Sequence, residues 1–501
     1  MQNFIPTQTG LNHETTLLIT QSHTGACGVD LPEVPDFAIK TGKKTRESIG
    51  LPQVTEPQVI RHFVRLSNQN YSIDSGFYPL GSCTMKHNPR LNEKMARLPG
   101  FANIHPLQNQ QTVQGALELM YNLQHWLGTL TGLEGVSLAP AAGAQGELAG
   151  MLVIKKAHEV KGQSHRKVVL IPDSAHGTNP ASAAICGFDI KVIPSDEEGL
   201  VNLAVFKELV ATHASELAGI MITNPNTCGK FEKNIVEIAD LVHKAGGYFY
   251  CDGANYNAIV GKVRPADIGV DVMHFNLHKT FSTPHGGGGP GSGPIAVRKE
   301  LAEFLPSPHV EKNNNTFYFA KPKHSCGKVK GFNGQFGMHV RALTYMLSHG
   351  ADALQKVAED AVISANYILT KLKEHFHVPF NGYCMHECLL TDKLQKAQGV
   401  STLDIAKALI EFGIHPMTVF FPLVVQGAML IEPTETENKQ TIDNFVSTMI
   451  YIANEIKNGN GDKFHQYPLH TPRRRLNEVQ AAKTPILTWA ELIKDSPFNQ
   501  N

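Results

Sequence analysis

Short apolar runs alternate with helical patterns through the middle of the chain. Several runs have the length of buried strands, at residues 168–171, 190–193, 220–223, 248–251, 272–277 and 295–297. Elsewhere apolar residues recur at steps of three and four, which is typical of amphipathic helices, as at Ala116, Met120, Leu123, Leu127 and Leu130. Strands that alternate with helices need crossover connections. The pattern therefore predicts an α/β fold with a mostly parallel sheet flanked by helices.

The first 110 residues have a different pattern. They are rich in Pro, Gly and Asn and contain few periodic apolar runs. Turn-forming residues dominate 78–84, so we expect a loop there. One short helix is predicted near residues 58–66. We therefore predict an extended N-terminal arm, which must pack on the body of this chain or on a partner.

The last third of the chain begins after a polar insertion at residues 305–330. Strand-like and helical runs mix beyond it. Thr434 and Glu437 have the spacing of a capping box before a further helix. We therefore expect three parts: the N-terminal arm (1–110), a large domain (111–330) and a smaller α+β C-terminal domain (331–501).

Composition excludes several classes of protein. Lys and Arg number 45 and Asp and Glu number 45, so the net charge is zero and a general nucleic-acid-binding surface is not expected. The apolar stretch at residues 419–431 falls short of the roughly 20 residues of a membrane helix, and we expect buried strand or core there. Eight cysteines are too sparse for a disulfide scaffold, and the first residues carry no secretory signal pattern. These features favour a cytoplasmic enzyme with reduced thiols.

Lys279 is the first candidate for chemistry. It follows an apolar run and precedes a glycine-rich stretch. An amine in such apolar surroundings is a candidate Schiff-base lysine, because desolvation favours the neutral, nucleophilic form. The alternative is an ordinary surface lysine.

Asp252 lies 27 residues earlier, directly after the strand-like run 248–251. A carboxylate at the carboxyl end of a buried strand faces the crevice in which α/β sheets bind ligands. Enzymes that use pyridoxal phosphate (PLP) need a carboxylate there to keep the pyridine nitrogen protonated. The alternative is a turn or helix-capping Asp, since Gly253 follows.

Two further segments could contact such a cofactor. Residues 139–147 are small and glycine-rich and open a helical pattern, so their backbone N–H groups could reach a phosphate. His176, in the loop 173–180, could stack on a cofactor ring, although a lone loop histidine is more often a structural residue.

Two other patterns carry no site. Gly286, Gly288 and Gly291 match G-x-G-x-x-G, but Pro290 interrupts the run and no helix begins there, so a Rossmann fingerprint is rejected. Cys384 and Cys388 flank His386 without a second pair of ligands, so we expect core thiols and no metal site.

Four motifs carry a resemblance to a known family. They are Tyr-Pro-Leu-Gly-Ser-Cys-Thr-Met-Lys at 78–86, Ser-Ala-His-Gly-Thr-Asn-Pro at 174–180, Asn-Leu-His-Lys-Thr-Phe at 276–281 and Gly-Ala-Met-Leu-Ile-Glu-Pro-Thr-Glu at 427–435. They resemble the glycine decarboxylase P-protein of the glycine cleavage system, from about residue 30 to about residue 490. The chain looks like the second subunit of the two-chain form. This resemblance implies a fold-type I PLP-dependent transferase-like enzyme.

The resemblance assigns roles to individual residues. Lys279 would carry PLP as a Schiff base, Asp252 would contact the pyridine nitrogen, and His176 would stack on the ring. Other cofactor contacts are implied at Ala144, Gln145, Ala254 and His278. Many two-chain members have His where this chain has Gln145, so the role of that side chain stays open.

The implied reaction is PLP-dependent decarboxylation of glycine, followed by transfer of the aminomethyl group to the lipoyl group of H-protein. The implied partners are subunit 1, with two of each chain, and lipoylated H-protein. Ser82, Thr84 and Arg341 are candidates for binding the glycine carboxylate. Cys83 is interpreted as a buried loop thiol rather than a redox group.

Two other classes of function compete with this interpretation. One is another fold-type I PLP enzyme, such as a desulfurase, which would need a mobile catalytic cysteine, or an aminotransferase. The other is a non-catalytic scaffold subunit. Lys279 and Asp252 together argue against a scaffold, because a scaffold needs neither.

Overall fold

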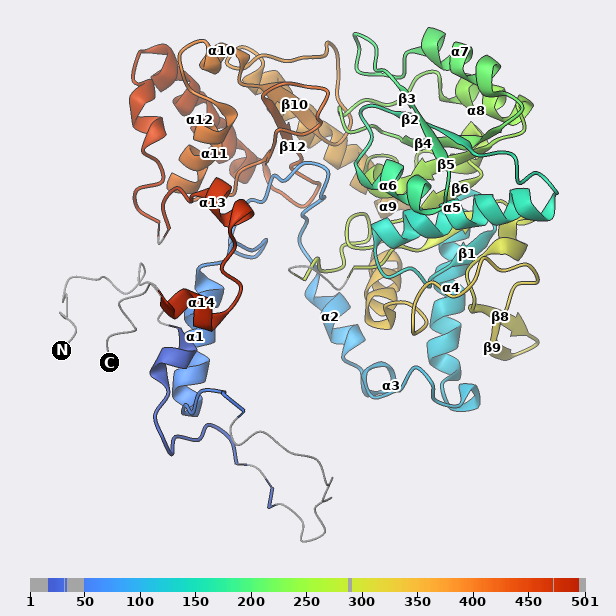
Figure 1. Cartoon of the computed structure of the whole chain (residues 1–501), viewed down its shortest axis with the longest axis horizontal. Helices are drawn as coiled ribbons and strands as arrows, with labels where there is room; N and C mark the ends of the chain where they lie inside the picture. Colours follow the sequence, from blue (N-terminus) through green and yellow to red (C-terminus); the bar gives the residue numbers. More distant parts are fainter. Residues whose placement is uncertain (1–16, 31, 34–48, 287–290, 472, 495–501) are drawn as a thin grey trace. The chain divides into compact units, whose positions relative to one another are not determined.

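The computed structural model describes residues 17–30, 32–33, 49–286, 291–471 and 473–494. The chain forms two compact units (Figure 1). One contains Met1–Ser75 and Gln466–Asn501, and the other contains Gly76–His465. The division into an arm, a large domain and a small domain stays a prediction.

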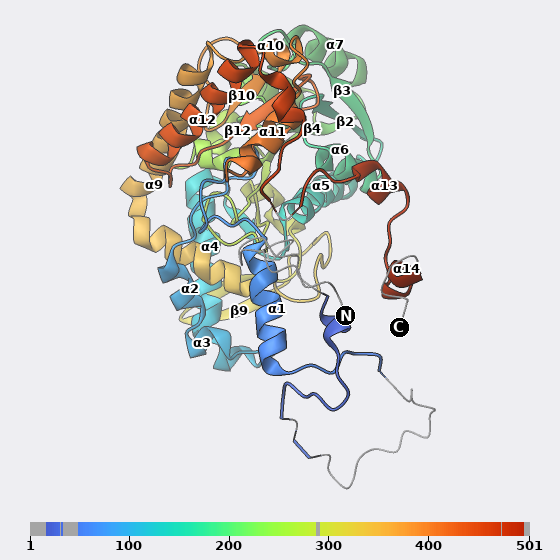
Figure 2. The same cartoon turned by 90° about the vertical axis from the view of Figure 1, so that its left-hand side faces the viewer.

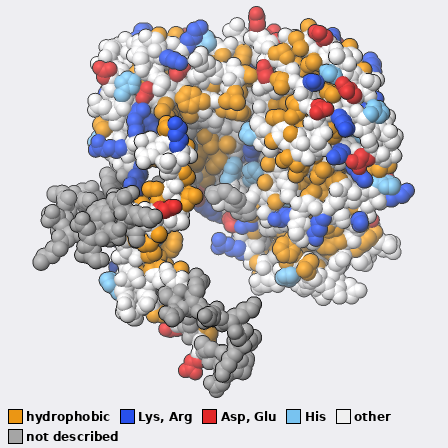
Figure 3. All heavy atoms as spheres, viewed as in Figure 1, with side chains coloured by type: hydrophobic (Ala, Val, Ile, Leu, Met, Phe, Trp, Pro, Cys, Tyr) orange, Lys and Arg blue, Asp and Glu red, His pale blue; other side chains and the backbone are white. Residues whose placement is uncertain are grey.

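The first unit is built around helix α1 (Glu56–Asn68), which confirms the helix predicted near residues 58–66. Gln58 stabilises its start by accepting a hydrogen bond from the Thr55 N–H at 2.8 Å. Ile60, Phe63 and Val64 of α1 are more than half exposed, and Figure 3 shows hydrophobic side chains gathered over this helix. The unit also contains η1 (Leu18–Gln21), α13 (Glu478–Lys483) and α14 (Trp489–Lys494).

The second unit contains a seven-stranded sheet with the order β1-β7-β6-β5-β4-β2-β3. Only β7 is antiparallel to its neighbours, so the sheet is mostly parallel, as predicted. The strands are β1 (Gly135–Ser137), β2 (Val168–Pro172), β3 (Asp189–Ile193), β4 (Leu217–Thr223), β5 (Tyr248–Asp252), β6 (Val272–His274) and β7 (Ile295–Val297).

Helices cover both faces of this sheet because alternate strand residues point to opposite sides. Ile220 and Ile222 of β4 pack in one core with α4 (Gln114–Thr131), α8 (Ile235–Lys244) and α9 (Phe336–Leu372). Met221, between them, packs in a second core with α5 (Gly143–Val160) and α6 (Thr178–Ile185). Other helical segments of this region are η2 (Gln110–Thr112), α7 (Leu203–His213), η3 (Gly253–Ala258), η4 (Pro265–Ile268) and η5 (Lys299–Phe304).

A small antiparallel sheet follows α9, a helix that breaks at Gly350. Its strands are β10 (Cys388–Thr391), β12 (Ala428–Ile431) and β11 (Thr418–Val419), in that order. Figure 2 shows α11 and α12 beside this sheet. The helices of this part are α10 (Lys393–Lys396), α11 (Thr402–Glu411), α12 (Lys439–Lys457) and η6 (Gly461–His465). The predicted strand or core at residues 419–431 is therefore two strands joined by a loop.

One local expectation differs from the structure, and two segments contain elements that the pattern did not predict. Asn438, not Thr434, caps α12, because its side chain accepts a hydrogen bond from the Thr441 N–H at 2.9 Å. The polar insertion contains a hairpin, β8 (His309–Asn313) and β9 (Thr316–Ala320), whose backbone is bound by Gln114 and Gln124. The predicted arm also contains α2 (Arg90–Ala96) and α3 (Pro99–Ala102), which belong to the second unit.

No helix among the described residues combines the length and the apolar character that crossing a membrane requires.

Close contact between α5 and β5 gives a test of the fold. A Cβ atom on Gly150 would lie 2.3 Å from the Tyr250 ring. Gly150→Ala should therefore lower the free energy of unfolding by about 1–3 kcal/mol. Gly115→Ala, at an open position in α4, is the matched control and should leave stability unchanged or raise it slightly. Chemical denaturation of both variants checks this. Equal stability of Gly150→Ala and the wild type would contradict the packing.

Candidate active site

The candidate site lies at the carboxyl ends of the central parallel strands. Asp252 is the last residue of β5 and pairs with Thr223, the last residue of β4. Lys279 lies in the turn after β6. Because parallel strands end at the same edge of a sheet, residues far apart in the sequence meet there. The two residues that the sequence singled out first therefore belong to one edge of the sheet.

Asp252 is 2% exposed and has defined partners on both carboxylate oxygens. Its Oδ1 accepts a hydrogen bond from the Ala254 N–H at 2.9 Å, and its Oδ2 accepts one from Asn179 Nδ2 at 2.9 Å. His274 Nε2 lies 3.4 Å from Oδ1. Burial would raise the pKa of Asp252, but His274, the two hydrogen bonds and Lys279 lower it below its usual value. Asp252 is therefore held as a carboxylate.

A second buried acid, Glu147 of α5, has a carboxylate oxygen within 4.8 Å of one of Asp252. The two hydrogens of the Asn179 amide are donated to different acids, since Nδ2 also lies 2.7 Å from Glu147 Oε2. Burial and the charge of Asp252 raise the pKa of Glu147 to about 9. Two carboxylates this close in a buried site do not both ionise. At neutral pH the negative charge therefore resides on Asp252, and Glu147 keeps its proton.

His274 and Tyr250 extend the buried polar network around Asp252. The Tyr250 hydroxyl lies 2.7 Å from His274 Nδ1, and Asn276 Nδ2 lies 3.0 Å from His274 Nε2. Burial lowers the pKa of His274, although Asp252 opposes the shift. The ring is thus fixed through both nitrogens.

The Lys279 amine donates a hydrogen bond to the Ser82 carbonyl at 2.7 Å. This contact joins the turn after β6 to the predicted loop 78–84. The charge of Lys279 acts to lower the pKa values of two pairs of acids, Asp252 with Glu147 and Glu387 with Glu432. For Glu147, Glu387 and Glu432 burial outweighs this effect, and their pKa values are raised overall. Lys279 is therefore the charge that the two pairs have in common.

His278 is a neutral neighbour of this amine. Burial, followed by the charges of His285 and Lys279, lowers the pKa of His278 to about 3. Burial and Lys279 lower the pKa of His285 to about 4, and the two rings meet edge to face at 5.2 Å. His285 Nε2 is buried without a hydrogen-bond partner among the described residues, so it is able to bind a further group.

The start of α5 suits an anion. Ala142, its N-cap residue, makes no side-chain capping bond, and Ala144 in the first turn is exposed. A Cβ on Gly143 would lie 2.3 Å from Asn276 Oδ1, so only glycine fits there. The first N–H groups of a helix lack partners within it, and they favour negative charge.

Gln145 has a structural role at this helix start. Its Oε1 accepts a hydrogen bond from the Ala141 N–H and its Nε2 donates one to the Val329 carbonyl, both at 2.6 Å. The side chain thus ties the loop before α5 to a distant segment. Any phosphate contact at this position therefore falls to the backbone.

His176 is exposed in the bend before α6. Its Nδ1 lies 2.8 Å from Thr178 Oγ1, and its ring meets the Phe421 ring edge to face at 5.9 Å. Asn179, three residues later, is the amide that joins Glu147 to Asp252. The loop of His176 thus belongs to the site, and ring stacking by His176 stays a prediction.

Sequence reasoning missed Glu147, Asn179 and His274 as site residues. A polar residue on the buried face of a helix, such as Glu147 beside Leu148 and Ala149, was the available signal. Arg341, one of the three candidates for the glycine carboxylate, stays a candidate, but its guanidinium already has a partner. Glu93 occupies it with two hydrogen bonds of 2.7 and 2.8 Å.

Cys83 is half-buried in the loop that meets Lys279. Burial raises the pKa of its thiol, as do Glu432 and Glu387, while Lys279 opposes this. The thiol form is therefore favoured, as expected for a buried loop thiol. All eight cysteines of the chain are free.

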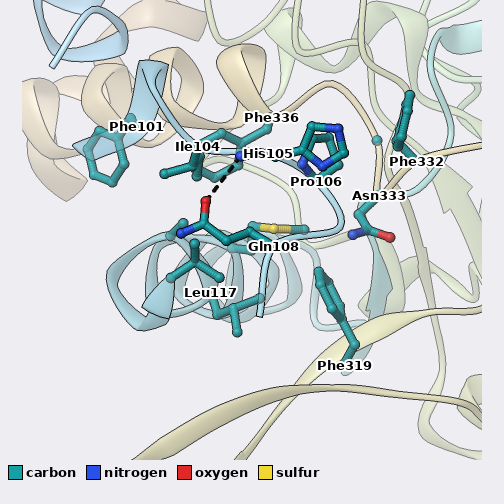
Figure 4. A pocket seen from close by; sticks show the side chains of 14 residues that line it. Phe101, Ile104, His105, Pro106, Gln108, Leu117, Phe319, Phe332, Asn333 and Phe336 are labelled. Atoms are coloured by element: carbon teal, nitrogen blue, oxygen red, sulfur yellow. Dashed lines mark hydrogen bonds between the residues drawn. The ribbon is translucent and has the colours of Figure 1, made fainter. Parts of the chain in front are cut away.

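A separate apolar pocket lies away from these residues, between α4 and the segment before α9 (Figure 4). Its volume is about 110 Å³. Its walls are mainly aromatic and aliphatic, and include Phe101, Leu117, Phe319, Phe332 and Phe336. None of the candidate site residues lines it.

The donor set of the site fits PLP. It offers an amine at Lys279, a buried carboxylate at Asp252, and an uncapped helix start at α5. These three groups match an aldehyde, a ring nitrogen and a phosphate. His285 Nε2, which has no hydrogen-bond partner among the described residues, is a further polar atom that a ligand could bind here.

Two family models match the chain. The model of the glycine cleavage system P-protein matches residues 30–313, which is more than half of the sequence. The model of the glycine dehydrogenase C-terminal domain matches residues 357–470.

Curated relatives align over nearly the whole chain. The probable glycine dehydrogenase (decarboxylating) subunit 2 of Caulobacter vibrioides is 55% identical over 490 residues, which cover 96% of this chain and 93% of the relative. The protein of the same name from Bacillus cytotoxicus is 49% identical and covers 95% of this chain and 98% of its own length.

Solved structures share the fold. A glycine decarboxylase (P-protein) in inhibitor-bound form has a TM-score of 0.68 at 19% identity and covers 83% of this chain and 93% of its own. Glutamate decarboxylase of Lactobacillus brevis has a TM-score of 0.61 at 12% identity, covering 85% and 96%. A NifS-like protein from Rickettsia africae has a TM-score of 0.55 at 16% identity, covering 76% and 99%.

These structures confirm the fold-type I architecture that the sequence predicted. The sequence matches, which run through both the large sheet and the C-terminal part, confirm the family as well. The chain therefore belongs to the glycine cleavage system P-protein family, within which it groups with the proteins named glycine dehydrogenase (decarboxylating) subunit 2.

Proposed function

We propose that this chain is the lysine-bearing subunit of a PLP-dependent glycine decarboxylase that passes the aminomethyl group to the lipoyl group of H-protein. The observation that carries the proposal is the placement of Lys279 and Asp252 at one edge of the sheet in a chain of this family. When bound, PLP supplies an electron sink for the electrons of the bond that breaks.

The chain offers a group for each part of this cofactor. Lys279 would bind the aldehyde carbon, Asp252 the ring nitrogen, and His176 one face of the ring. The backbone of α5 at Ala144 and Gln145 would bind the phosphate. Ala254 and His278 would lie at the edges, where the Ala254 N–H also fixes Asp252.

Asp252 would keep the ring nitrogen of the cofactor protonated, and its surroundings support that role. Glu147 stays neutral beside it, so the negative charge is concentrated on the carboxylate that faces the cofactor site. Asn179 fixes the orientation of both acids. A carboxylate fixed in this way needs no reorganisation during the reaction.

Ser82 and Thr84 remain the candidates for binding the glycine carboxylate. Ser82 is in direct contact with Lys279 through its carbonyl, and its hydroxyl is buried without a partner among the described residues. An unpartnered buried hydroxyl is available to donate to a carboxylate. Arg341, the third candidate, is already bound by Glu93.

We assign the chain a subunit 1 partner, in an assembly with two of each chain, and a cytoplasmic location. The relatives' printed names, which identify them as subunit 2, support a partner subunit. The exposed apolar side chains of α1 suit the N-terminal arm for an interface with it. Glycine and lipoylated H-protein are the proposed substrates.

A desulfurase-like activity has less support. The NifS-like structures share only the fold with this chain. A desulfurase needs a reactive cysteine, and reactive cysteines are those with lowered pKa values. Burial instead raises the pKa of Cys83, the thiol in the loop that contacts Lys279.

Exchange of the glycine carboxyl group with labelled CO2 tests the proposed reaction. The complete complex with subunit 1 and H-protein should catalyse it. Asp252→Asn should lower the exchange rate by about a hundredfold or more, because a buried charged partner is lost. Asp271→Asn is the matched control. Asp271 is also a buried aspartate, but it precedes β6 at the opposite edge of the sheet. Full exchange by Asp252→Asn, or none by the wild-type complex, would refute the proposal.

Stability as a function of pH tests the neutral state of Glu147. Its pKa is about 9 instead of 4.5, so the folded chain retains a proton that the unfolded chain loses. Through this group the free energy of unfolding should fall as the pH rises from about 5 to about 9. Glu147→Gln should remove that fall. Urea unfolding of both proteins across this range measures the difference, and a difference that does not change with pH would contradict the assignment.

A further inference from the structure

A second group of buried acids lies near Lys279, apart from Asp252. Glu387 directly precedes β10 and Glu432 directly follows β12. Antiparallel pairing of Cys388 with Ile431 brings the two glutamates together, although they are far apart in the sequence. Both side chains are 0% exposed, and their carboxylate oxygens lie within 4.8 Å of each other and of a His386 ring nitrogen.

The two glutamates bind the backbone of the loop that contacts Lys279. The Ser82 N–H donates to Glu387 Oε2 at 2.7 Å, and the Thr84 N–H donates to Glu432 Oε2 at 2.9 Å. Both loop residues have left-handed backbone angles, with φ of 62° and 45°. Residues other than glycine adopt this region only at an energetic cost, so surrounding contacts must hold them.

The loop in turn fixes the amine. The carbonyl of Ser82 accepts the hydrogen bond of Lys279 Nζ at 2.7 Å, while the N–H of the same residue is bound by Glu387. Gly81 packs so closely on β12 that a Cβ there would lie 2.6 Å from the Leu430 carbonyl. Ser82 is therefore held from both sides, and it points its carbonyl at the amine.

Burial favours the uncharged forms of all three side chains of this cluster, Glu387, Glu432 and His386. Burial and the charge of Glu432 raise the pKa of Glu387 far above its usual value, and burial raises the pKa of Glu432 to about 7. Burial lowers the pKa of His386 to about 3, so this ring is neutral. The cluster therefore keeps at least one proton at neutral pH.

Other charged and titratable groups around the cluster do not neutralise it. Lys86, the next lysine along the loop, is paired with Glu435 at 2.7 Å. Glu435 nevertheless raises the pKa of Glu432. The further groups that interact electrostatically with the two glutamates are Lys279, Cys83, Cys228, Cys384 and Cys388. Lys279 is the cation among the groups that act on both glutamates.

We propose that Glu387 and Glu432 act as one coupled pair of carboxyls that positions the Ser82 carbonyl against the Lys279 amine and presents negative charge toward it. They are positioning residues, because they act on Lys279 through Ser82. The proposal rests on the proposed function only in taking Lys279 as the cofactor lysine.

Coupling between the two acids has a consequence that independent acids would not have. If one glutamate becomes glutamine, its repulsion of the other is lost, so the remaining glutamate ionises at lower pH and the pair retains negative charge. The amide oxygen of glutamine still accepts the backbone hydrogen bond. Only the double substitution removes the charge.

The pH dependence of Lys279 reactivity in the cofactor-free chain tests this. Reductive methylation by formaldehyde and cyanoborohydride, followed by mass spectrometry of the Lys279 peptide, reports the neutral amine. Glu387→Gln and Glu432→Gln alone should leave the pH profile nearly unchanged. The double variant should move it by about one pH unit to lower pH, which means roughly tenfold faster modification at a given pH.

Glu232→Gln is the matched control. Glu232 is also buried and accepts a backbone hydrogen bond, from the Val201 N–H at 2.8 Å. It should leave the profile unchanged. Shifts of the single variants that add up to that of the double variant, or a double variant that behaves like Glu232→Gln, would overturn the coupled pair.

Infrared difference spectroscopy keeps the proposal testable if the double variant does not fold. Beside the band of protonated Glu147, which all variants retain, the wild type should show the C=O band of a further protonated carboxyl that each single variant lacks, because the remaining glutamate ionises. Retention of this band by Glu432→Gln would overturn the proposal. Both measurements use the chain without cofactor, so their outcome is distinct from failure of the glycine exchange.

Discussion

The constraint on which this site depends is the burial of four acids around one amine. Removing a carboxylate from water is costly unless a positive charge or hydrogen bonds compensate it. Lys279 acts on Asp252 and Glu147 and also on Glu387 and Glu432. In each pair, repulsion and burial leave a proton on one acid. The site therefore presents defined charges instead of a diffuse acidic surface.

The two pairs differ in what they hold in place. Asp252 and Glu147 are joined by the Asn179 amide at the edge of the large sheet, where a ligand of the sheet would bind. Glu387 and Glu432 hold the loop of Ser82, which comes from before the large sheet in the sequence. Lys279 is thus bound by the Ser82 loop and feels the charges of acids from the two sheets, so its surroundings depend on the complete fold of the second unit.

Much of this could be predicted from the sequence because it follows from local pattern. Periodic apolar runs gave the sheet and its helices, and positions at strand ends identified Lys279 and Asp252. Contacts across long separations could not be found in this way. The Ser82 N–H and Glu387 are 305 residues apart, and only the pairing of β10 with β12 brings Glu387 beside Glu432. The Glu93 partner of Arg341 could not be predicted for the same reason, since the two residues are 248 apart.

The central claim is that Lys279 binds PLP, and borohydride reduction of the purified chain tests it most directly. The wild type, with subunit 1 present if needed, should take up PLP and show a near-visible absorbance band. Borohydride should abolish the band and fix the cofactor onto the Lys279 peptide, and Lys279→Ala should show neither. A wild-type chain that takes up no PLP even with its partner, or reduction onto another lysine, would contradict the account.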